Sequence, residues 1–165
     1  MQLKKMFFIG CFCTIFLAKT PLSSALPEKE PSSEMDSWKK ELVQLAVQAR
    51  KKSYSPYSHF AVGAAIKTKG GKIYTGTNVE NASYGMTICA ERCAAFRAVA
   101  EGSLDLEAIA ISLKAGGSPC GACRQVLNEF NPNILILIGN EDGSLIQEKR
   151  LSELLPEAFG PKNLE

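Results

Sequence analysis

Residues 118–124 read SPCGACR, in which Cys120 and Cys123 are separated by two residues and flanked by a proline and an arginine. Zinc sites, redox-active pairs and iron–sulfur proteins all use this CxxC spacing, and buried cysteines also occur as plain core residues. The pair alone therefore does not choose a chemistry. What it does mark is a boundary, because a loop rich in Gly, Ser and Pro ends here and a helical pattern begins.

The segments around this pair alternate between helical and strand patterns. A helix is predicted from Asp36, a capping residue ahead of an apolar face, to about Lys52. Two alternating stretches flank the turn Lys69–Gly71 and predict a β-hairpin. Further along, the pattern predicts a helix over 88–102, a strand over 107–114, a helix over 121–130, a strand over 134–139, a short strand over 145–150 and a turn of helix over 152–155.

This alternation predicts an α/β fold, namely a three-layer α/β/α sandwich with one central mixed β-sheet. The chain has 165 residues, of which 45% are hydrophobic and 22% charged, with a net charge of +2. That composition suits one compact domain. Lysine and arginine are scattered along the sequence rather than clustered in a basic stripe, so no nucleic-acid partner is predicted.

The first 35 residues differ in character from the rest. A basic start, an apolar run and a stretch of small residues predict a signal peptide over 1–25, or else an upstream start before Met35. The apolar run is too short to span a membrane, so no membrane partner is expected for the mature form. The polar, Pro-containing segment 26–35 is predicted to be a linker, and the folded domain is expected over 36–165.

Four cysteines lie in the body of the chain, and three of them stand where helices begin. Cys89 opens the helix over 88–102, and Cys120 and Cys123 are expected in the first turn of the helix over 121–130. Helices that follow neighbouring strands bring their N-termini to one edge of a sheet, so the three sulfurs can converge. Three thiolates with an open position are typical of a catalytic zinc site. Glu91 would then lie beside the metal and could serve as a general base.

Two other residues compete for a place in this site. Cys93 lies four residues after Cys89 on the same helix face and could close the site as a fourth, structural ligand. We favour the interpretation that Cys93 is a small core residue, because free cysteine is among the most buried side chains. His59, the one histidine of the chain, is expected to be structural or exposed.

The cysteine motifs, CAER at 89–92 and PCGACRQVL at 119–127, resemble those of the small, homotetrameric, zinc-dependent cytidine deaminases. The resemblance extends to YSPYSHFAVGAA, GTNVENASYG and ELLPEAFGP, so that it covers nearly all of residues 36–162. It implies an enzyme of pyrimidine salvage. This hydrolase would act on the C–N bond of a cyclic amidine, converting cytidine or deoxycytidine to uridine or deoxyuridine and ammonia.

The resemblance also implies roles for individual residues. One Zn²⁺ per subunit would be held by Cys89, Cys120 and Cys123, and Glu91 would carry a proton from water to N3 of the cytosine ring and on to the departing amine. Arg92 matches an arginine that hydrogen-bonds the ligating sulfurs. The implied substrate-binding residues are Phe60, Asn78, Glu80, Ala90 and Phe159, with Phe159 reaching a neighbouring subunit's site and Tyr84 at a subunit junction.

Three alternatives remain open at this point. A blasticidin-type deaminase would share the three cysteines and the glutamate, a non-catalytic zinc module would use four ligands, and a polynucleotide deaminase would need a basic channel. The resemblance favours the cytosol as the compartment, whereas a cleaved segment 1–25 would mean export.

Overall fold

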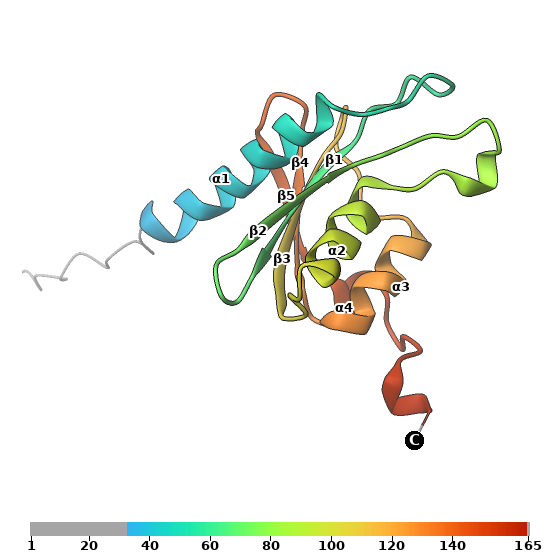
Figure 1. Cartoon of the computed structure of the whole chain (residues 1–165). Coiled ribbons are helices and arrows are strands. Elements are labelled where there is room, and N and C mark those ends of the chain that lie inside the picture. The colour runs from blue at the N-terminus through green and yellow to red at the C-terminus, as the bar shows by residue number, and fades with distance from the viewer. Residues whose placement is uncertain (1–32, 165) are drawn as a thin grey trace, which may run out of the picture. The chain divides into compact units, whose positions relative to one another are not determined.

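The structure is a computed structural model that describes residues 33–164 (Figure 1). The predicted segment 1–25 and most of the predicted linker lie outside these residues. Residues 33–35, expected to belong to the linker, form the start of a helix. None of the described helices combines the length and the hydropathy that a membrane span requires.

The secondary structure follows the predicted order, with differences at the ends of elements. The helix expected from Asp36 to Lys52 begins three residues earlier and ends two residues earlier, since the apolar periodicity marks the packed face rather than the hydrogen-bonded ends. The helices are α1 (Ser33–Arg50), α2 (Ala90–Ala100), α3 (Gly121–Phe130) and α4 (Leu151–Leu154), and the strands are β1 (Gly63–Thr68), β2 (Ile73–Thr77), β3 (Leu106–Ser112), β4 (Leu135–Gly139) and β5 (Leu145–Arg150). The remaining elements of the described residues are two short 3-10 turns, η1 (Tyr84–Met86) and η2 (Pro161–Asn163).

The five strands form one mixed sheet in the order β2-β1-β3-β4-β5. Strands β3 and β4 pair in parallel, and the three other pairs, β1 with β2, β1 with β3 and β4 with β5, are antiparallel. The hairpin expected around Lys69–Gly71 joins β1 to β2, and Gly71 takes the left-handed φ of 81° that glycine readily adopts. The prediction of a central mixed sheet is confirmed.

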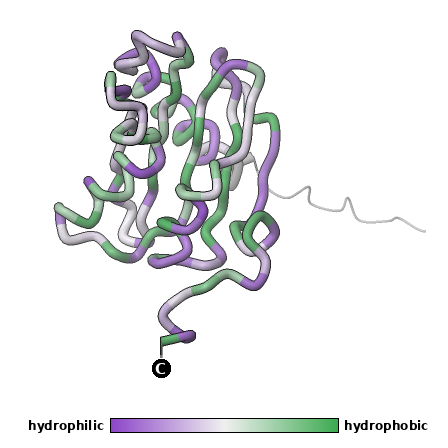
Figure 2. The backbone as a smooth tube through the Cα atoms, turned by 90° about the vertical axis from the view of Figure 1, so that its right-hand side faces the viewer, coloured by the Kyte–Doolittle hydropathy of each residue, from purple (hydrophilic) through white to green (hydrophobic). Residues whose placement is uncertain are grey.

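Alternate residues of the strands face two separate cores, as a sheet covered on both faces requires. On one face, Ala65, Ala108 and Leu137 pack against α1. On the other face of the sheet, Ile66 of β1 and Ile109 of β3 belong to a core that also contains side chains of α2 and α3. Figure 1 shows α1 on one side of the sheet and α2 and α3 on the other, and hydrophobic stretches run along the interior strands in Figure 2.

Two glycines allow the helices to lie close to the sheet. A Cβ on Gly63 of β1 would stand 2.1 Å from the carbonyl oxygen of Ala46 in α1. A Cβ on Gly76 of β2 would stand 2.4 Å from the backbone nitrogen of Ala94 in α2. Because neither separation is possible for real atoms, only glycine fits at these positions, and Gly76 helps to set the place of the helix that begins at Cys89.

Candidate metal centre and active site

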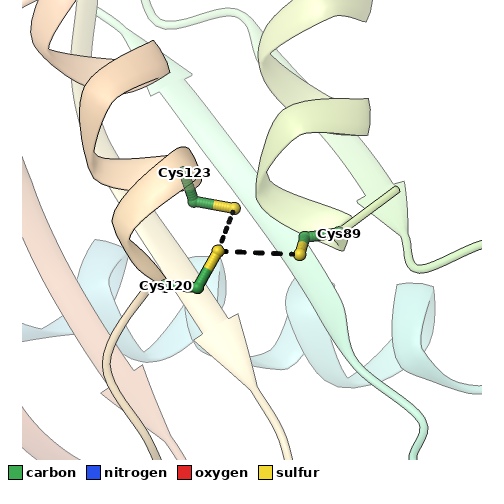
Figure 3. Close-up of side chains that lie close together, drawn as sticks. All are labelled: Cys89, Cys120 and Cys123. Carbon is green, nitrogen blue, oxygen red and sulfur yellow. Dashed lines mark hydrogen bonds between the residues drawn. The ribbon is translucent and has the colours of Figure 1, made fainter. Parts of the chain in front are cut away.

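The sulfurs of Cys89, Cys120 and Cys123 lie together, all within 4.8 Å of one another. The Sγ–Sγ distance is 3.9 Å from Cys89 to Cys120 and 3.5 Å from Cys120 to Cys123. Figure 3 shows the three side chains pointing toward one another, Cys89 from the start of α2 and the other two from the start of α3. The convergence that the sequence predicted is present.

The local backbone differs slightly from the expected one. Cys89 and Cys120 are the N-cap residues of α2 and α3, with extended ψ angles of 153° and 167°, so they stand just before the first helical turn rather than in it. Cys123 lies in the first turn of α3. All three sulfurs therefore lie at helix N-termini, where unpaired backbone N–H groups and the helix dipole stabilise negative charge.

The thiol of Cys89 is poised to ionise. Hydrogen bonds, first with Cys123 and then with Arg92 and Cys120, together lower the pKa of Cys89 to about 5 against the opposing effect of burial. The same hydrogen bond, together with burial, raises the pKa of Cys123, which keeps its proton while Cys89 is ionised. A thiolate already formed at neutral pH is the form in which cysteine binds a metal.

Glu91 lies in the first turn of α2 and is only 5% exposed. Burial raises its pKa above that of an ordinary glutamate, and the negative charge of Cys89 acts in the same direction. A buried carboxyl group whose pKa is raised holds its proton more readily than an ordinary glutamate does, which suits a general acid–base.

Arg92 supplies positive charge beside the sulfurs. Its Nη2 lies 3.7 Å from Cys89 Sγ and 3.5 Å from the carbonyl oxygen of Thr87. The hydrogen bond with Cys89 raises the pKa of Arg92, so the guanidinium is charged. This position agrees with the contact expected for Arg92.

Cys93 and His59 do not join the group of sulfurs. Among the described residues, the potential metal-binding group contains only Cys89, Cys120 and Cys123. Cys93 is half-buried, its Cβ lies against Gly76 of β2, and burial raises the pKa of its thiol. His59 is exposed and has a positive φ of 56°.

A cavity of about 470 Å³ opens beside the sulfurs. Of the residues predicted to bind metal or substrate, six line it: Phe60, Asn78, Glu80, Cys89, Glu91 and Cys120. Such a volume suits a small organic ligand. The side chains predicted from four separate stretches of the sequence thus meet at one site.

Asn78 and Glu80 also hold the loop at 53–62. The Asn78 side chain accepts hydrogen bonds from Ser53 Oγ at 2.6 Å and from the backbone N–H of Val62 at 2.8 Å, and it donates to the carbonyl of Phe60 at 2.8 Å. The carboxylate of Glu80 accepts from the backbone of Tyr57 and from Ser58. These two residues therefore line the cavity and also hold the loop that forms part of its wall.

Besides Cys123 and Arg92, three further predicted residues lie outside this lining. Ala90 is fully buried at the start of α2, next to Cys89. Tyr84 is 75% exposed in η1 and packs edge-on against Tyr57, with ring centroids 5.9 Å apart. Phe159 is 59% exposed, and its carbonyl accepts hydrogen bonds from Gln125 and Asn128 of α3.

The cavity also has walls that the sequence did not single out. They are formed by Ser58, Val62, Thr87, Ile88, Leu113, Gly116, Gly117 and Ser118. The run of small residues just before Cys120 is the signal that could have indicated the last three, since a loop entering a metal-binding helix N-terminus borders the site. Ser58 carried no such signal.

Comparisons with known proteins agree with this geometry. Residues 36–138 match the model of the cytidine and deoxycytidylate deaminase zinc-binding region. The chain is 49% identical over 126 residues to the cytidine deaminase of Halalkalibacterium halodurans, covering 74% of this chain and 95% of that protein. It is 44% identical to the cytidine deaminase of Sporosarcina psychrophila, covering 92% of that protein.

Solved structures give the same result for the fold. The crystal structure of cytidine deaminase from Burkholderia pseudomallei superposes with a TM-score of 0.69 at 44% identity, covering 72% of this chain and 97% of that one. The cytidine deaminase of Mycobacterium tuberculosis superposes with a TM-score of 0.65 at 40% identity, covering 75% and 98% of the two chains.

Proposed function

Because this chain belongs to the cytidine and deoxycytidylate deaminase zinc-binding family, we propose that it deaminates cytidine and deoxycytidine by hydrolysis, giving uridine or deoxyuridine and ammonia. The observation that carries the proposal is the group of three thiols beside a buried glutamate at one cavity. We take the deaminase domain as residues 36–165.

The residues fit a zinc ion. A tetrahedral zinc with Zn–S bonds of about 2.3 Å places its sulfurs about 3.8 Å apart. The Sγ–Sγ distances from Cys120 to its two neighbours are 3.9 and 3.5 Å, and all three sulfurs lie within 4.8 Å of one another. Three protein ligands leave the fourth position open, as catalytic sites do. Zinc held by Cys89, Cys120 and Cys123 would supply Lewis acidity that makes water nucleophilic at neutral pH.

Glu91 moves the protons of the reaction. Its buried carboxylate takes one proton from the attacking water and delivers it to N3 of the cytosine ring as oxygen is added at C4. It then carries the second proton to the exocyclic nitrogen, so that the C4–N bond breaks and ammonia leaves. Burial keeps bulk water from competing for these protons.

Arg92 and the two helix N-termini balance the charge of the site. Three thiolates around a divalent ion sum to one negative charge, which opposes the removal of a proton from water. The guanidinium of Arg92 lies against Cys89 and reduces the electron density that this sulfur donates.

The remaining contacts select a nucleoside. Phe60 packs against the pyrimidine ring, and the backbone at Ala90 meets the edge of the base. Glu80 and the second N–H of the Asn78 amide hydrogen-bond a ribose hydroxyl, since one N–H of that amide is already donated to the carbonyl of Phe60. Unpaired polar groups would be left if a free base occupied the site.

The complete active site is assembled in a homotetramer. Phe159 and Tyr84 are large aromatic side chains that stand 59% and 75% exposed, which is costly on a monomer and expected at an interface. Phe159 stacks on the base held by a neighbouring subunit, and Tyr84 lies at a subunit junction.

The protein works in the cytosol, where reduced thiols remain available for zinc.

The ultraviolet absorbance of cytidine, followed with the zinc-loaded full chain, tests the proposed function. We expect the absorbance to fall toward that of uridine with the parent protein and to stay constant with Glu91→Gln. A zinc-loaded parent that leaves cytidine and deoxycytidine unchanged would reject the function.

A further inference from the structure

Ser58 connects the two sides of the cavity that are proposed to hold the base and the ribose. Its hydroxyl donates to Glu80 Oε1 and accepts the backbone N–H of Phe60 at 3.0 Å. A serine hydroxyl has a single proton. Since the Phe60 N–H occupies an acceptor position, the hydroxyl proton is free to point at Glu80, and one side chain links both residues.

The carboxylate of Glu80 has little freedom in this arrangement. While Oε1 accepts from the Ser58 hydroxyl, Oε2 accepts from the backbone N–H groups of Tyr57 at 2.9 Å and Ser58 at 3.2 Å. The hydrogen bond from the Ser58 side chain is the main reason that the pKa of Glu80 is lowered. Glu80 is therefore held as a carboxylate in the lining of the cavity, and its Oε1, which accepts one of these hydrogen bonds, has the capacity to accept another.

The backbone between Ser58 and Phe60 is bent to make the link possible. His59 adopts a left-handed φ of 56°, which is uncommon for a residue other than glycine. Its N–H donates to the carbonyl of Ser55 at 3.0 Å, and the following N–H turns back to the Ser58 hydroxyl. A conformation of this kind persists where surrounding contacts maintain it, and it is common at ligand-binding loops.

We propose that Ser58 is a positioning residue that sets the spacing between Phe60 and Glu80 and thereby makes the site selective for substrates with a ribose hydroxyl. The inference rests on the proposed function and deepens it. Ser58 acts through Glu80: without the hydroxyl, the carboxylate loses one of its donors and no longer presents a fixed acceptor to the sugar. Chemistry at C4 depends on Glu91 and the three cysteines, none of which Ser58 is seen to contact, and should continue.

Kinetics on the zinc-loaded full chain, with cytidine and 2′,3′-dideoxycytidine as substrates, test this role. For Ser58→Ala we expect KM for cytidine to rise roughly tenfold, the effect of a lost hydrogen bond to a charged group. The value of kcat should stay within about twofold, because the reacting atoms lie near Glu91. The kcat/KM for dideoxycytidine should be unchanged, so the discrimination between the two substrates shrinks.

Three further variants of the chain test whether the effect is specific to the Ser58 hydroxyl and its hydrogen bond with Glu80. Ser58→Thr keeps the hydroxyl and should restore the discrimination. Ser55→Ala, in the same loop but without a contact to Glu80, should behave like the parent. In a Glu80→Gln background, Ser58→Ala should add little, because the two residues act as one unit.

Equal losses for both substrates would show that Ser58 only supports the loop and would overturn the proposal, as would an unchanged KM for cytidine. In both of those cases an active parent leaves the proposed function intact. A parent that does not turn over cytidine would overturn the function and the role of Ser58 together.

Discussion

Arg92 places a guanidinium nitrogen 3.7 Å from the sulfur of Cys89, while its Nε is buried and lacks a hydrogen-bond partner within residues 33–164. A buried donor without an acceptor is costly, so the side chain is held there for another reason. Charge provides it, because the thiolate of Cys89 needs a nearby cation. The arrangement ties the affinity for zinc to a residue that does not bind it.

Arg92→Gln should therefore weaken both zinc binding and turnover. Substitutions of groups that hydrogen-bond metal ligands cost about 10- to 100-fold in affinity or activity. Competition with a chromophoric chelator measures the affinity, and cytidine turnover measures kcat. Arg97→Gln, five residues further along the same helix and paired with Glu101 at the surface, serves as the matched control. Equal behaviour of the two variants would refute this account of Arg92.

The sequence predicted the fold well because each element carried a local signal. The apolar face of α1, the glycine turn between β1 and β2, and the β-branched run of β4 depend on neighbours in the chain, and all three are present. The predicted start of α1 at Asp36 was wrong, because the helix begins at Ser33 while the apolar pattern used for the prediction begins at Trp38. Periodicity carries no information there.

The site was predicted less completely, for a related reason. The meeting of Cys89 with Cys120 could be expected from two helix N-termini on one face of a sheet. The link from Ser58 to Glu80 joins residues 22 positions apart through a left-handed bend at His59, and no local pattern encodes it. Leu113 and Gly116 likewise reach the cavity only through the course of the loop after β3.

Glu91→Gln should remove catalysis while leaving the metal in place. The amide is close in shape to the carboxyl group but cannot move protons, and general acid–base catalysis contributes about 10²- to 10⁴-fold. Turnover of cytidine and zinc content per chain are the two measurements. Glu101→Gln, an exposed glutamate at the end of α2, should keep full activity. Loss of zinc from Glu91→Gln would mean that this residue supports the metal site instead.

Cys93→Ala separates a catalytic three-sulfur site from a structural four-sulfur one. The Cβ of Cys93 lies against Gly76 of β2, and its thiol is outside the group of three. We expect zinc content and activity close to those of the parent, whereas Cys123→Ala should lose the metal. Atomic emission of the purified proteins gives the zinc content. Release of zinc from Cys93→Ala would favour the structural module.

Gly63→Ala should destabilise the domain. The added Cβ would come within 2.1 Å of the carbonyl oxygen of Ala46, so α1 must move away from β1. Overpacking of this kind typically costs about 1–3 kcal/mol. Urea unfolding at a fixed protein concentration measures the change in free energy. Gly70→Ala, where the nearest atom to the new Cβ is 3.8 Å away, is the control and should unfold at the same urea concentration as the parent.

Phe159 is held by its backbone and presents its ring outward. Its carbonyl accepts from Gln125 Nε2 at 2.9 Å and from Asn128 Nδ2 at 3.2 Å, and 59% of the residue is exposed. Both donors belong to α3, the helix that begins at Cys120 and holds Cys123. A ring exposed in this way is free to contact another subunit, as the proposed shared site requires.

Mixing two impaired variants tests whether Phe159 acts in a neighbouring subunit. Phe159→Ala and Glu91→Gln should each be impaired alone, the first through a raised KM and the second through a lowered kcat. In hybrid oligomers formed by unfolding and refolding them together, some sites combine an intact Glu91 with an intact Phe159 from the neighbour. Turnover of cytidine at low substrate should then exceed the sum of the separate proteins. If Phe159 served the site of its own chain, no hybrid site would hold both residues and the mixture would show only that sum.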